Sequence, residues 1–254
     1  KIRREYIEEI TGADLSSVGK YTIPIDRVVS RNIENMIGCV QIPLGTAGPL
    51  SVNGEYAKGS FWIPLATTEG ALIASINRGC SAISKAGGAD VRIFHDAMTR
   101  APVFAAKNIL HAADSVHWIE ENFSAIKEAA EKTTSHGKLE RISTYTAGTS
   151  VYVRMSYKTG DAMGMNMATI ASEAASKIIE EATGLRLIAS AGNMCCDKKP
   201  AAINAVEGRG KTVSAGVFLS DELIRTVLKT EAGLLIEVNM RKNLVGSARA
   251  GALG

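Results

Sequence analysis

The sequence predicts an α+β fold, and three observations support that prediction. An amphipathic helix, two strand-like stretches, a long helix and a further strand follow one another between about residues 102 and 190. Two more strand-like runs flank an Asn-Gly pair at residues 53–54, and helical patterns occupy residues 67–88 and 220–240. An α-β-β-α-β succession with short connections favours a small module with a largely antiparallel sheet.

The composition is that of a globular protein with a substantial core. Hydrophobic residues make up 46% and charged residues 22% of 254 residues. A net charge of +3, from basic residues scattered along the chain, gives no support for nucleic-acid binding. No apolar run reaches the roughly 18 to 20 residues that a membrane span requires. We therefore expect neither nucleic acid nor a membrane among its partners.

Cysteine usage predicts a reducing compartment. The four cysteines are Cys39, Cys80, Cys195 and Cys196. They form no C-x-x-C pair, and adjacent cysteines bridge each other only with strain. Free thiols in the cytoplasm are the natural interpretation.

The first third of the chain predicts a helical lead-in, a hairpin and a helix. Residues 1–37 form the helical segment, and the pattern in "DRVVSRNIENMIG" closes at Gly38. The strand-like runs 39–54 and 59–66 meet at the Asn-Gly turn. A helix capped by Thr67 or Thr68 follows, and Gly87-Gly88 ends it.

The rest of the chain predicts alternating helices and strands. In order, we expect a helix over 113–132, strands over 139–147 and 150–157, a turn at 159–161, a helix over 162–183 capped by Gly184, a strand over 185–190, a strand over 212–219 and mostly helix over 220–240. No internal repeat interrupts this order.

Two glycine-containing stretches are candidates for phosphate sites. Residues ending at Gly210-Lys211-Thr212 fail as a P-loop, because Ala205 stands where the motif requires glycine and strand-like residues follow. In "TGDAMGMNM" (159–167), small residues open the long helix, whose free N–H groups favour a phosphate. The alternative, a turn with Asp161 as N-cap and a methionine-rich core face, stays open.

Two charged stretches carry candidate chemistry. Glu69 lies at a helix start, where a carboxylate is favoured without any catalytic role. Lys198 and Lys199 follow Asp197 and form either a solvated cluster or a lysine held in a protected site, where its ammonium can stabilise an oxyanion.

Seven blocks occur in a characteristic order along nearly the whole chain. They are "ENMIG", "PLGTAGPL", "ATTEG" with "ASINRGCSAI", "DAMTRAPV", "GDAMGMNM", "DKKPAAIN.VEGRGKTV" and "IEVNMRKNLVGSA". Together they resemble the signature blocks of the 3-hydroxy-3-methylglutaryl-coenzyme A (HMG-CoA) reductase family, in its biosynthetic, NADPH-using class.

The resemblance implies an oxidoreductase. It reduces the thioester of HMG-CoA with two NADPH to mevalonate, through a hemithioacetal and mevaldehyde, and releases coenzyme A. By position in its motif, Glu69 is the catalytic acid and Lys198 the lysine that stabilises the oxyanion. The alternatives are the NAD-dependent degradative class and a non-catalytic ligand-binding fragment. A thiol-redox role for Cys195 and Cys196 ranks last.

The resemblance also implies two groups of binding residues and no metal. The substrate-binding group is Arg100, Ser190, Asn193, Asp197, Lys199 and Lys242. The cofactor-binding group is Asn77, Arg78, Ser135, Asp161, Met163, Gly164, Met165 and Asn166. Arg100 and Lys242 match positions that pair with the substrate carboxylate. The family serine that contacts substrate aligns with Ala191, one residue after Ser190. A family Ser-Arg pair reads Ser135-His136 here, with Lys138 as a substitute cation.

The domain organisation implied by the resemblance has three parts. A helical N-terminal segment covers 1–37, a large HMG-CoA-binding domain covers 38–101 and 190–254, and an inserted ferredoxin-like NADP(H)-binding domain covers 102–189. Active sites shared between subunits imply a homodimer or higher homo-oligomer. The Cys195–Cys196 peptide is expected to be cis. The family's catalytic Asp and His fall beyond residue 254, so the chain is expected to be C-terminally incomplete.

Overall fold

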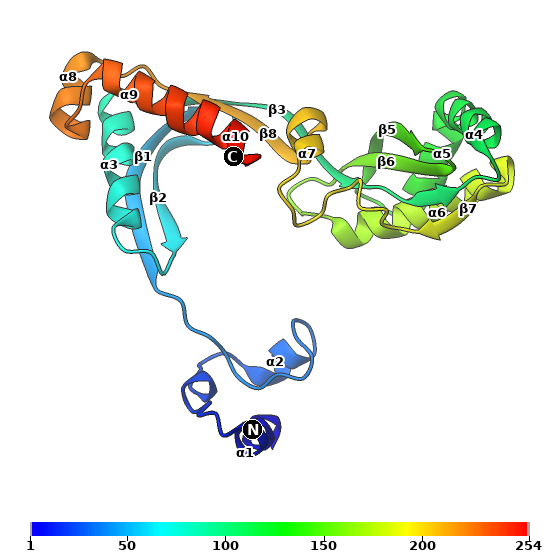
Figure 1. Cartoon of the computed structure of the whole chain (residues 1–254), viewed down its shortest axis with the longest axis horizontal. Helices are drawn as coiled ribbons and strands as arrows, with labels where there is room; N and C mark the ends of the chain where they lie inside the picture. Colours follow the sequence, from blue (N-terminus) through cyan, green and yellow to red (C-terminus); the bar gives the residue numbers. More distant parts are fainter. Residues whose placement is uncertain (1, 253–254) are drawn as a thin grey trace.

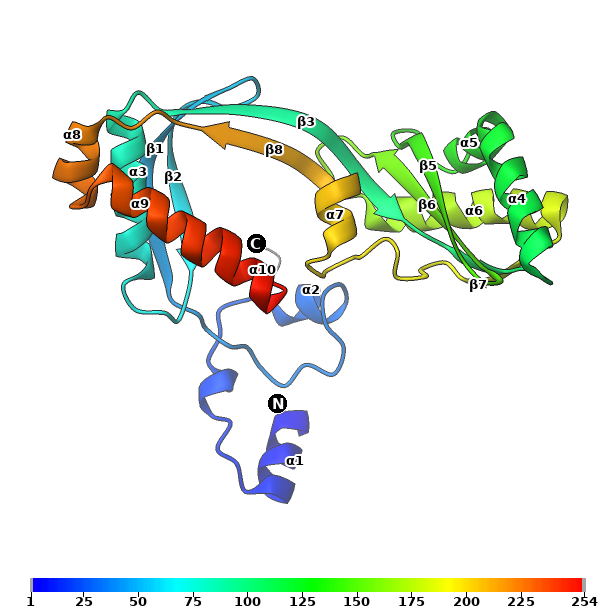
Figure 2. The same cartoon turned by 45° about the horizontal axis from the view of Figure 1, so that its top comes forward.

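The computed structural model describes residues 2–252, which form two lobes joined by two long strands (Figures 1 and 2). The strands are β1 (Leu44–Gly54), β2 (Lys58–Ala66), β3 (Ala89–Arg100), β4 (Val103–Ala105), β5 (Lys138–Ala147), β6 (Ser150–Lys158), β7 (Arg186–Ala189) and β8 (Gly210–Gly216). The α-helices are α1 (Ile2–Thr11), α2 (Ile25–Val29), α3 (Leu72–Lys85), α4 (Ile109–Glu121), α5 (Phe123–Glu131), α6 (Met165–Thr183), α7 (Ala202–Glu207), α8 (Asp221–Leu223), α9 (Ala232–Val238) and α10 (Ser247–Ala250). The mixed helix and strand content of the predicted α+β class is thereby confirmed.

The N-terminal segment projects away from both lobes (Figure 1). Neither α1 nor α2 contains a buried residue. The helix expected from residue 26 to Gly38 was wrong in extent, because α2 ends at Val29 and no helix follows before β1. Five residues form too short a helix to be stable without a packed face.

The first lobe begins with the predicted hairpin. β1 and β2 pair antiparallel from Leu44↔Ala66 to Asn53↔Lys58. Both residues of the Asn-Gly pair lie in β1, so the chain turns at residues 55–57, slightly later than expected. The first strand starts at Leu44 and not at residue 39, as expected. Its register shifts around Gly48, whose N–H donates to Oδ1 of Asn77 on α3 at 2.9 Å.

Helix α3 begins later than the sequence predicts. Neither Thr67 nor Thr68 is its N-cap, because the helix starts at Leu72 after a left-handed Ala71 with φ of 65°. Thr67 instead accepts the N–H of Glu69 in a local turn, at 2.9 Å. The competition between a side-chain turn and the helix explains the shift. The predicted stop is confirmed, since the N–H of Gly88 closes on Ile83 O at 3.0 Å.

Strands β3 and β8 connect the lobes (Figure 2). They pair antiparallel from Asp90↔Gly216 to Ala97↔Gly210. At one end β3 runs parallel to β1, and at the other it pairs antiparallel with β6 through Met98–Arg100. The eight strands therefore form one continuous sheet, in the order β2-β1-β3-β6-β4-β7 with β5 beside β6 and β8 beside β3.

The second lobe is a β-α-α-β-β-α-β succession with antiparallel neighbours throughout. Its strands lie in the order β5-β6-β4-β7. One helix was expected over 113–132, but Asn122 separates α4 from α5. The core comes from alternate residues of β6 and from the inner faces of the helices, among them Val151, Val153, Ile126 and Ile179, each fully buried.

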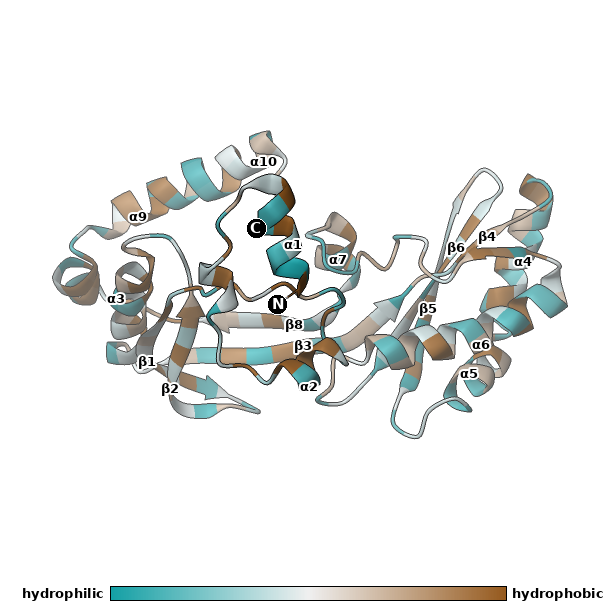
Figure 3. Ribbon diagram, turned by 90° about the horizontal axis from the view of Figure 1, so that it is seen from below, coloured by the Kyte–Doolittle hydropathy of each residue, from teal (hydrophilic) through white to brown (hydrophobic). Residues whose placement is uncertain are grey.

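The C-terminal part of the described chain forms α8, a π-helical stretch Ile224–Leu228, α9, a second π-helical stretch Asn239–Gly246 and α10. This series runs beside the first lobe, and apolar and polar residues alternate along its ribbon in Figure 3. Several of its apolar side chains, such as Ile236 and Leu244, are exposed. No helix among residues 2–252 combines the length and apolarity needed to cross a membrane.

Candidate functional site

Residues 193–200, called the lysine loop below, form a tight turn between β7 and α7. Asn193, Cys196 and Lys198 all have positive φ, of 64°, 45° and 61°. Such conformations cost side-chain-bearing residues of the order of 1 kcal/mol each and concentrate at functional sites. The turn is closed by the N–H of Cys196, which donates to Asn193 O at 3.1 Å. Its conformation is therefore imposed by the contacts around it.

The peptide bond inside this loop differs from the expectation. Among residues 2–252 the cis peptide is Gly48–Pro49, so the cis bond expected at Cys195–Cys196 is not found. All four cysteines are free, as predicted.

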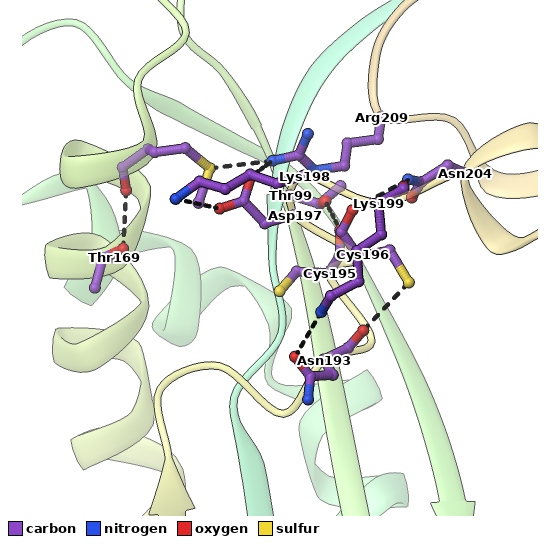
Figure 4. Close-up of polar contacts among 11 residues, drawn as sticks. Thr99, Thr169, Asn193, Cys195, Cys196, Asp197, Lys198, Lys199, Asn204 and Arg209 are labelled. Carbon is purple, nitrogen blue, oxygen red and sulfur yellow. Dashed lines mark hydrogen bonds and ion pairs between the residues drawn. The ribbon is translucent and has the colours of Figure 1, made fainter. Parts of the chain in front are cut away.

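Lys198 lies at the outer edge of the loop. Its side chain is 84% exposed, and its Nζ is 4.0 Å from Oδ2 of Asp197 (Figure 4). Within this single chain, therefore, the Lys198 side chain is open to water. Its ammonium is thus free to approach a ligand. While water surrounds the ammonium, its attraction for a negative charge on that ligand is weak.

Asp197 is held by a second cation. Oδ1 of Asp197 accepts from Nη2 of Arg209 at 2.6 Å, and the two side chains are only 22% and 14% exposed. The same Arg209 nitrogen lies 3.3 Å from Sδ of Met165, the first residue of α6. One guanidinium therefore connects the lysine loop to the start of the long helix.

Arg154 anchors the loop from below. This β6 residue is 1% exposed, and it donates from Nε to Met194 O at 3.1 Å and from Nη2 to Gly208 O at 2.8 Å. Burial lowers the pKa of its guanidinium, because desolvation disfavours the charged form. Thr99 of β3, also buried, donates to Cys195 O at 3.1 Å. The sheet thus fixes the backbone that precedes Lys198.

The remaining predicted substrate residues are dispersed around this loop. Nζ of Lys199 donates to Oδ1 of Asn193 at 3.1 Å. Ser190 donates to Glu173 on α6 at 3.0 Å. Arg100 ends β3 and is half-buried, with an Nε that has no partner among residues 2–252. Lys242 is exposed on the C-terminal helical series.

A cavity of about 520 Å³ lies at the start of α6. Two segments distant in sequence enclose it: Thr134, His136 and Gly137 from the α5–β5 connection, and residues 159–164 with Met167 from the other side. The structure therefore brings the Ser135 region beside the Asp161–Gly164 region, two stretches that the family resemblance assigns to one cofactor site.

The cavity leaves backbone atoms accessible. Gly164 precedes α6 with φ of 70°, and no side chain caps the helix. Asp161 as N-cap was therefore wrong, since the helix begins four residues later. A Cβ on Gly160 would meet no atom within 4 Å, so the backbone there faces open space. Met163 and Asn166 are exposed, and Met165 touches Arg209.

The family's Ser-Arg pair, matched here by Ser135 and His136, falls in the α5–β5 connection that borders the cavity. His136 lines the cavity, and its Nδ1 is 2.7 Å from Ser135 Oγ. Lys138 is engaged with Glu131 at 3.2 Å. Of the two residues His136 and Lys138, His136 is the one that lines the cavity.

Glu69, Asn77 and Arg78 lie in the other lobe. Glu69 is exposed in the β2–α3 connection, and Figures 1 and 2 place that connection apart from α7 and the lysine loop. Asn77 contacts Gly48, and Arg78 is exposed on α3. One chain therefore does not bring Glu69 to Lys198 or these α3 residues to the cavity.

Sequence reasoning missed Arg154 and Arg209. Arg154 interrupts the otherwise apolar strand "VYVRMSY", and a charge at a core position is a signal that was present in the sequence. Arg209 gave no local signal, because its partners lie 12 and 44 residues away.

The chain matches, over residues 1–254, the family model described as hydroxymethylglutaryl-coenzyme A reductase. It is 53% identical to the 3-hydroxy-3-methylglutaryl-coenzyme A reductase of Methanothermobacter thermautotrophicus, covering 100% of this chain and 64% of that protein. It is 52% identical to the protein of the same name from Haloferax volcanii, covering 99% of this chain and 62% of that protein. It is 41% identical to the protein of the same name from Catharanthus roseus, covering 100% of this chain and 42% of that protein. The chain thus spans less than two thirds of the length of these relatives.

A fold likeness agrees with these matches. The structure of the class II 3-hydroxy-3-methylglutaryl-CoA reductase from Streptococcus pneumoniae bound to NADPH superposes with a TM-score of 0.56 at 16% identity, covering 74% of this chain and 52% of that one. The chain belongs to the hydroxymethylglutaryl-coenzyme A reductase family.

Proposed function

We propose that the protein containing this chain reduces the thioester of HMG-CoA to mevalonate with two NADPH and releases coenzyme A. Family membership supports the reaction class. The observation that carries the assignment of residues is the Arg209 bridge, which places the lysine loop next to the first residue of α6. A charged side chain for the reacting carbonyl thus lies near the helix start that borders the cavity.

NADPH fits the cavity at α6. Its volume of about 520 Å³ is within the range of roughly 300–1,000 Å³ for small-molecule sites. Uncapped N–H groups at the helix start and bare backbone at Gly160 suit a phosphate group. Asp161 and Gly164 would hold it, with Met163, Met165 and Asn166 beside them. When bound, this cofactor supplies hydride.

The chain's own residues deal with the charge that reduction creates. Negative charge develops on the thioester oxygen, and the Lys198 ammonium stabilises it once water is displaced. The substrate approaches this ammonium past four side chains, those of Asp197, Lys199, Asn193 and Ser190. The substrate carboxylate pairs with Arg100 and Lys242. Glu69, when neutral, gives a proton to the aldehyde oxygen in the second reduction.

We propose a homodimer or higher homo-oligomer with shared active sites. The separation of Glu69 from Lys198 within one chain supports it, as do the exposed apolar residues Phe61, Trp62 and Phe94 around the first lobe. Asn77 and Arg78 reach the cavity of a neighbouring copy in this arrangement. Mixing Glu69→Gln and Lys198→Ala proteins is expected to restore about a quarter of the activity in a dimer. No recovery after subunit exchange would contradict the shared site.

The proposed organisation has a helical segment 1–37, an HMG-CoA-binding domain of 38–101 with 190–254, and a ferredoxin-like NADP(H)-binding domain of 102–189. The strand order β5-β6-β4-β7 supports the last. Free cysteines support a cytoplasmic location.

The lysine pair provides the experiment. Lys198→Ala is expected to abolish HMG-CoA-dependent NADPH oxidation and to retain binding of coenzyme A. Lys199→Ala is the matched control for charge: it removes the contact with Asn193 and is expected to act mainly on the KM for HMG-CoA. A Lys198→Ala protein that turns over at the unmodified rate would refute the assignment.

A further inference from the structure

We propose that Arg209 is a positioning residue for the reaction: it keeps the Asp197 carboxylate from neutralising Lys198 and fixes the lysine loop against the first residue of α6. This inference rests on the proposed function. It concerns a residue that lies within the "VEGRGKTV" block and received no role there.

The first step is the competition for Asp197. Its carboxylate has two cations within 4.0 Å, Arg209 at 2.6 Å and Lys198 at 4.0 Å (Figure 4). The short contact is largely shielded, whereas the lysine is 84% exposed. Without Arg209, Asp197 has Lys198 as its nearest charged partner, and a direct pair would draw the ammonium back onto its own loop.

The second step is how firmly Arg209 is placed. The residue before it, Gly208, is buried, and its carbonyl accepts from the buried Arg154 at 2.8 Å. A Cβ on Gly208 would come within 2.9 Å of the His95 ring, so the backbone there packs closely. The residue after it, Gly210, begins β8. Arg209 therefore extends from backbone that is fixed on both sides.

The third step is the double contact. Nη2 reaches Asp197 in the lysine loop and Met165 at the start of α6 with the same nitrogen. Nε of Arg209 is buried without a partner among residues 2–252. Because an unpaired buried donor costs folding free energy, stabilisation of the fold alone does not explain this ion pair. A planar guanidinium can hold both neighbours at once, which a lysine ammonium on a flexible stem does less well.

The test compares Arg209→Gln and Arg209→Lys with Lys211→Gln in the intact protein. Lys211 is the matched control, because it is a cation two residues away that pairs with Asp96 at 2.5 Å on a more exposed part of β8. Three quantities are measured for each: kcat with HMG-CoA and NADPH, the Kd for NADP⁺ alone, and the thermal unfolding temperature.

We expect Arg209→Gln to lower kcat about 100-fold, as a displacement of about 1 Å in a catalytic group does. Its Kd for NADP⁺ stays within about threefold, since Arg209 does not line the cavity. The kcat of Arg209→Lys is expected to be about tenfold higher than that of Arg209→Gln. The kcat of Lys211→Gln is expected to stay within about threefold of the unmodified protein.

Three results would overturn the inference. The first is an unchanged kcat in Arg209→Gln. The second is a kcat that falls only in proportion to weaker NADP⁺ binding and a lower unfolding temperature. The third is unmodified activity in Arg209→Lys, which would show that the contact with α6 has no role. If Arg209→Gln fails to fold, Arg209→Lys decides alone. Failure of the unmodified protein to oxidise NADPH with HMG-CoA would instead refute the proposed function.

Discussion

Gly164, at the start of α6, provides a quantitative test of how the cavity is built. Its φ is 70°, and a Cβ built on it would lie 2.5 Å from Cγ2 of Thr159. Thr159 cannot simply turn away, because its hydroxyl donates to Ala162 O at 2.6 Å. Alanine at this position must therefore adopt a disfavoured conformation and displace a side chain that closes the preceding turn.

The expected cost follows from these two terms. A left-handed conformation costs alanine about 1–2 kcal/mol, and the lost hydrogen bond of Thr159 about 1 kcal/mol, so Gly164→Ala is destabilised by about 2–3 kcal/mol. For a chain of this size that lowers the unfolding temperature by about 4–12 °C. Because the cavity wall moves, NADP⁺ affinity falls as well.

Gly160→Ala is the matched control. Its φ of 66° imposes the same conformational cost, but its Cβ would meet no atom within 4 Å. Calorimetric unfolding of both variants, and of Gly164→Ala in a Thr159→Ala background, separates the terms. The background is expected to relieve about 1 kcal/mol of the Gly164→Ala cost. The reasoning is refuted if Gly164→Ala is no less stable than Gly160→Ala.

Two further predictions concern the second lobe. Hydrogen bonds from Lys127 lower the pKa of Glu131 below its ordinary value of 4.5, with help from Lys138 and the N–H of Leu139. A carboxyl group whose pKa is lowered by folding stabilises the fold above its unfolded-state pKa, and this contribution is lost as the pH falls through its folded-state pKa. In urea unfolding, Glu131→Gln is therefore expected to be less stable than the unmodified protein at pH 7 and equally stable below pH 4.5. A gap that widens on acidification would contradict this. Burial raises the pKa of Tyr157, whose hydroxyl lies 3.0 Å from Ser172 Oγ. Tyr157→Phe is expected to cost about 1–2 kcal/mol in the same assay, and Tyr157→Phe with Ser172→Ala less than the sum of the single changes. Additive losses would show that the two hydroxyls do not interact.

Local signals predicted the elements that local chemistry determines. The Asn-Gly pair located the β1–β2 hairpin, Gly184 ended α6 with φ of 73°, and the strand after Gly210 excluded a P-loop. Helix starts were predicted too early at α3 and α6. In both, a threonine makes a local hydrogen bond that delays the helix, through Thr67 in one and Thr159 in the other.

Strand β3 was missed because its pattern changes along its length. Its first part alternates half-buried and exposed residues and includes Arg92 and His95, whereas Ala97, Met98 and Thr99 are buried in succession. This change follows the passage of the strand from one lobe to the other. Such a role depends on contacts distant in sequence, which no local window records.

The candidate residues come from the family resemblance and their roles stay predictions, whereas their geometry comes from the structure. The family resemblance selected Lys198, Asp197 and the 159–166 stretch, and the structure joins these through Arg209. The distance between Glu69 and Lys198 within one chain depends on the arrangement of two lobes, and the sequence carries no local mark of it.

The central claim is that this chain provides the lysine and the cofactor cavity for a two-step reduction of a thioester. The most direct measurement is the stoichiometry of NADPH oxidised per HMG-CoA consumed by the intact protein, with mevalonate and free coenzyme A thiol identified as products. Two NADPH are expected to be oxidised for each HMG-CoA consumed. Consumption of HMG-CoA without NADPH oxidation, or no consumption by a folded protein that binds both compounds, would contradict it.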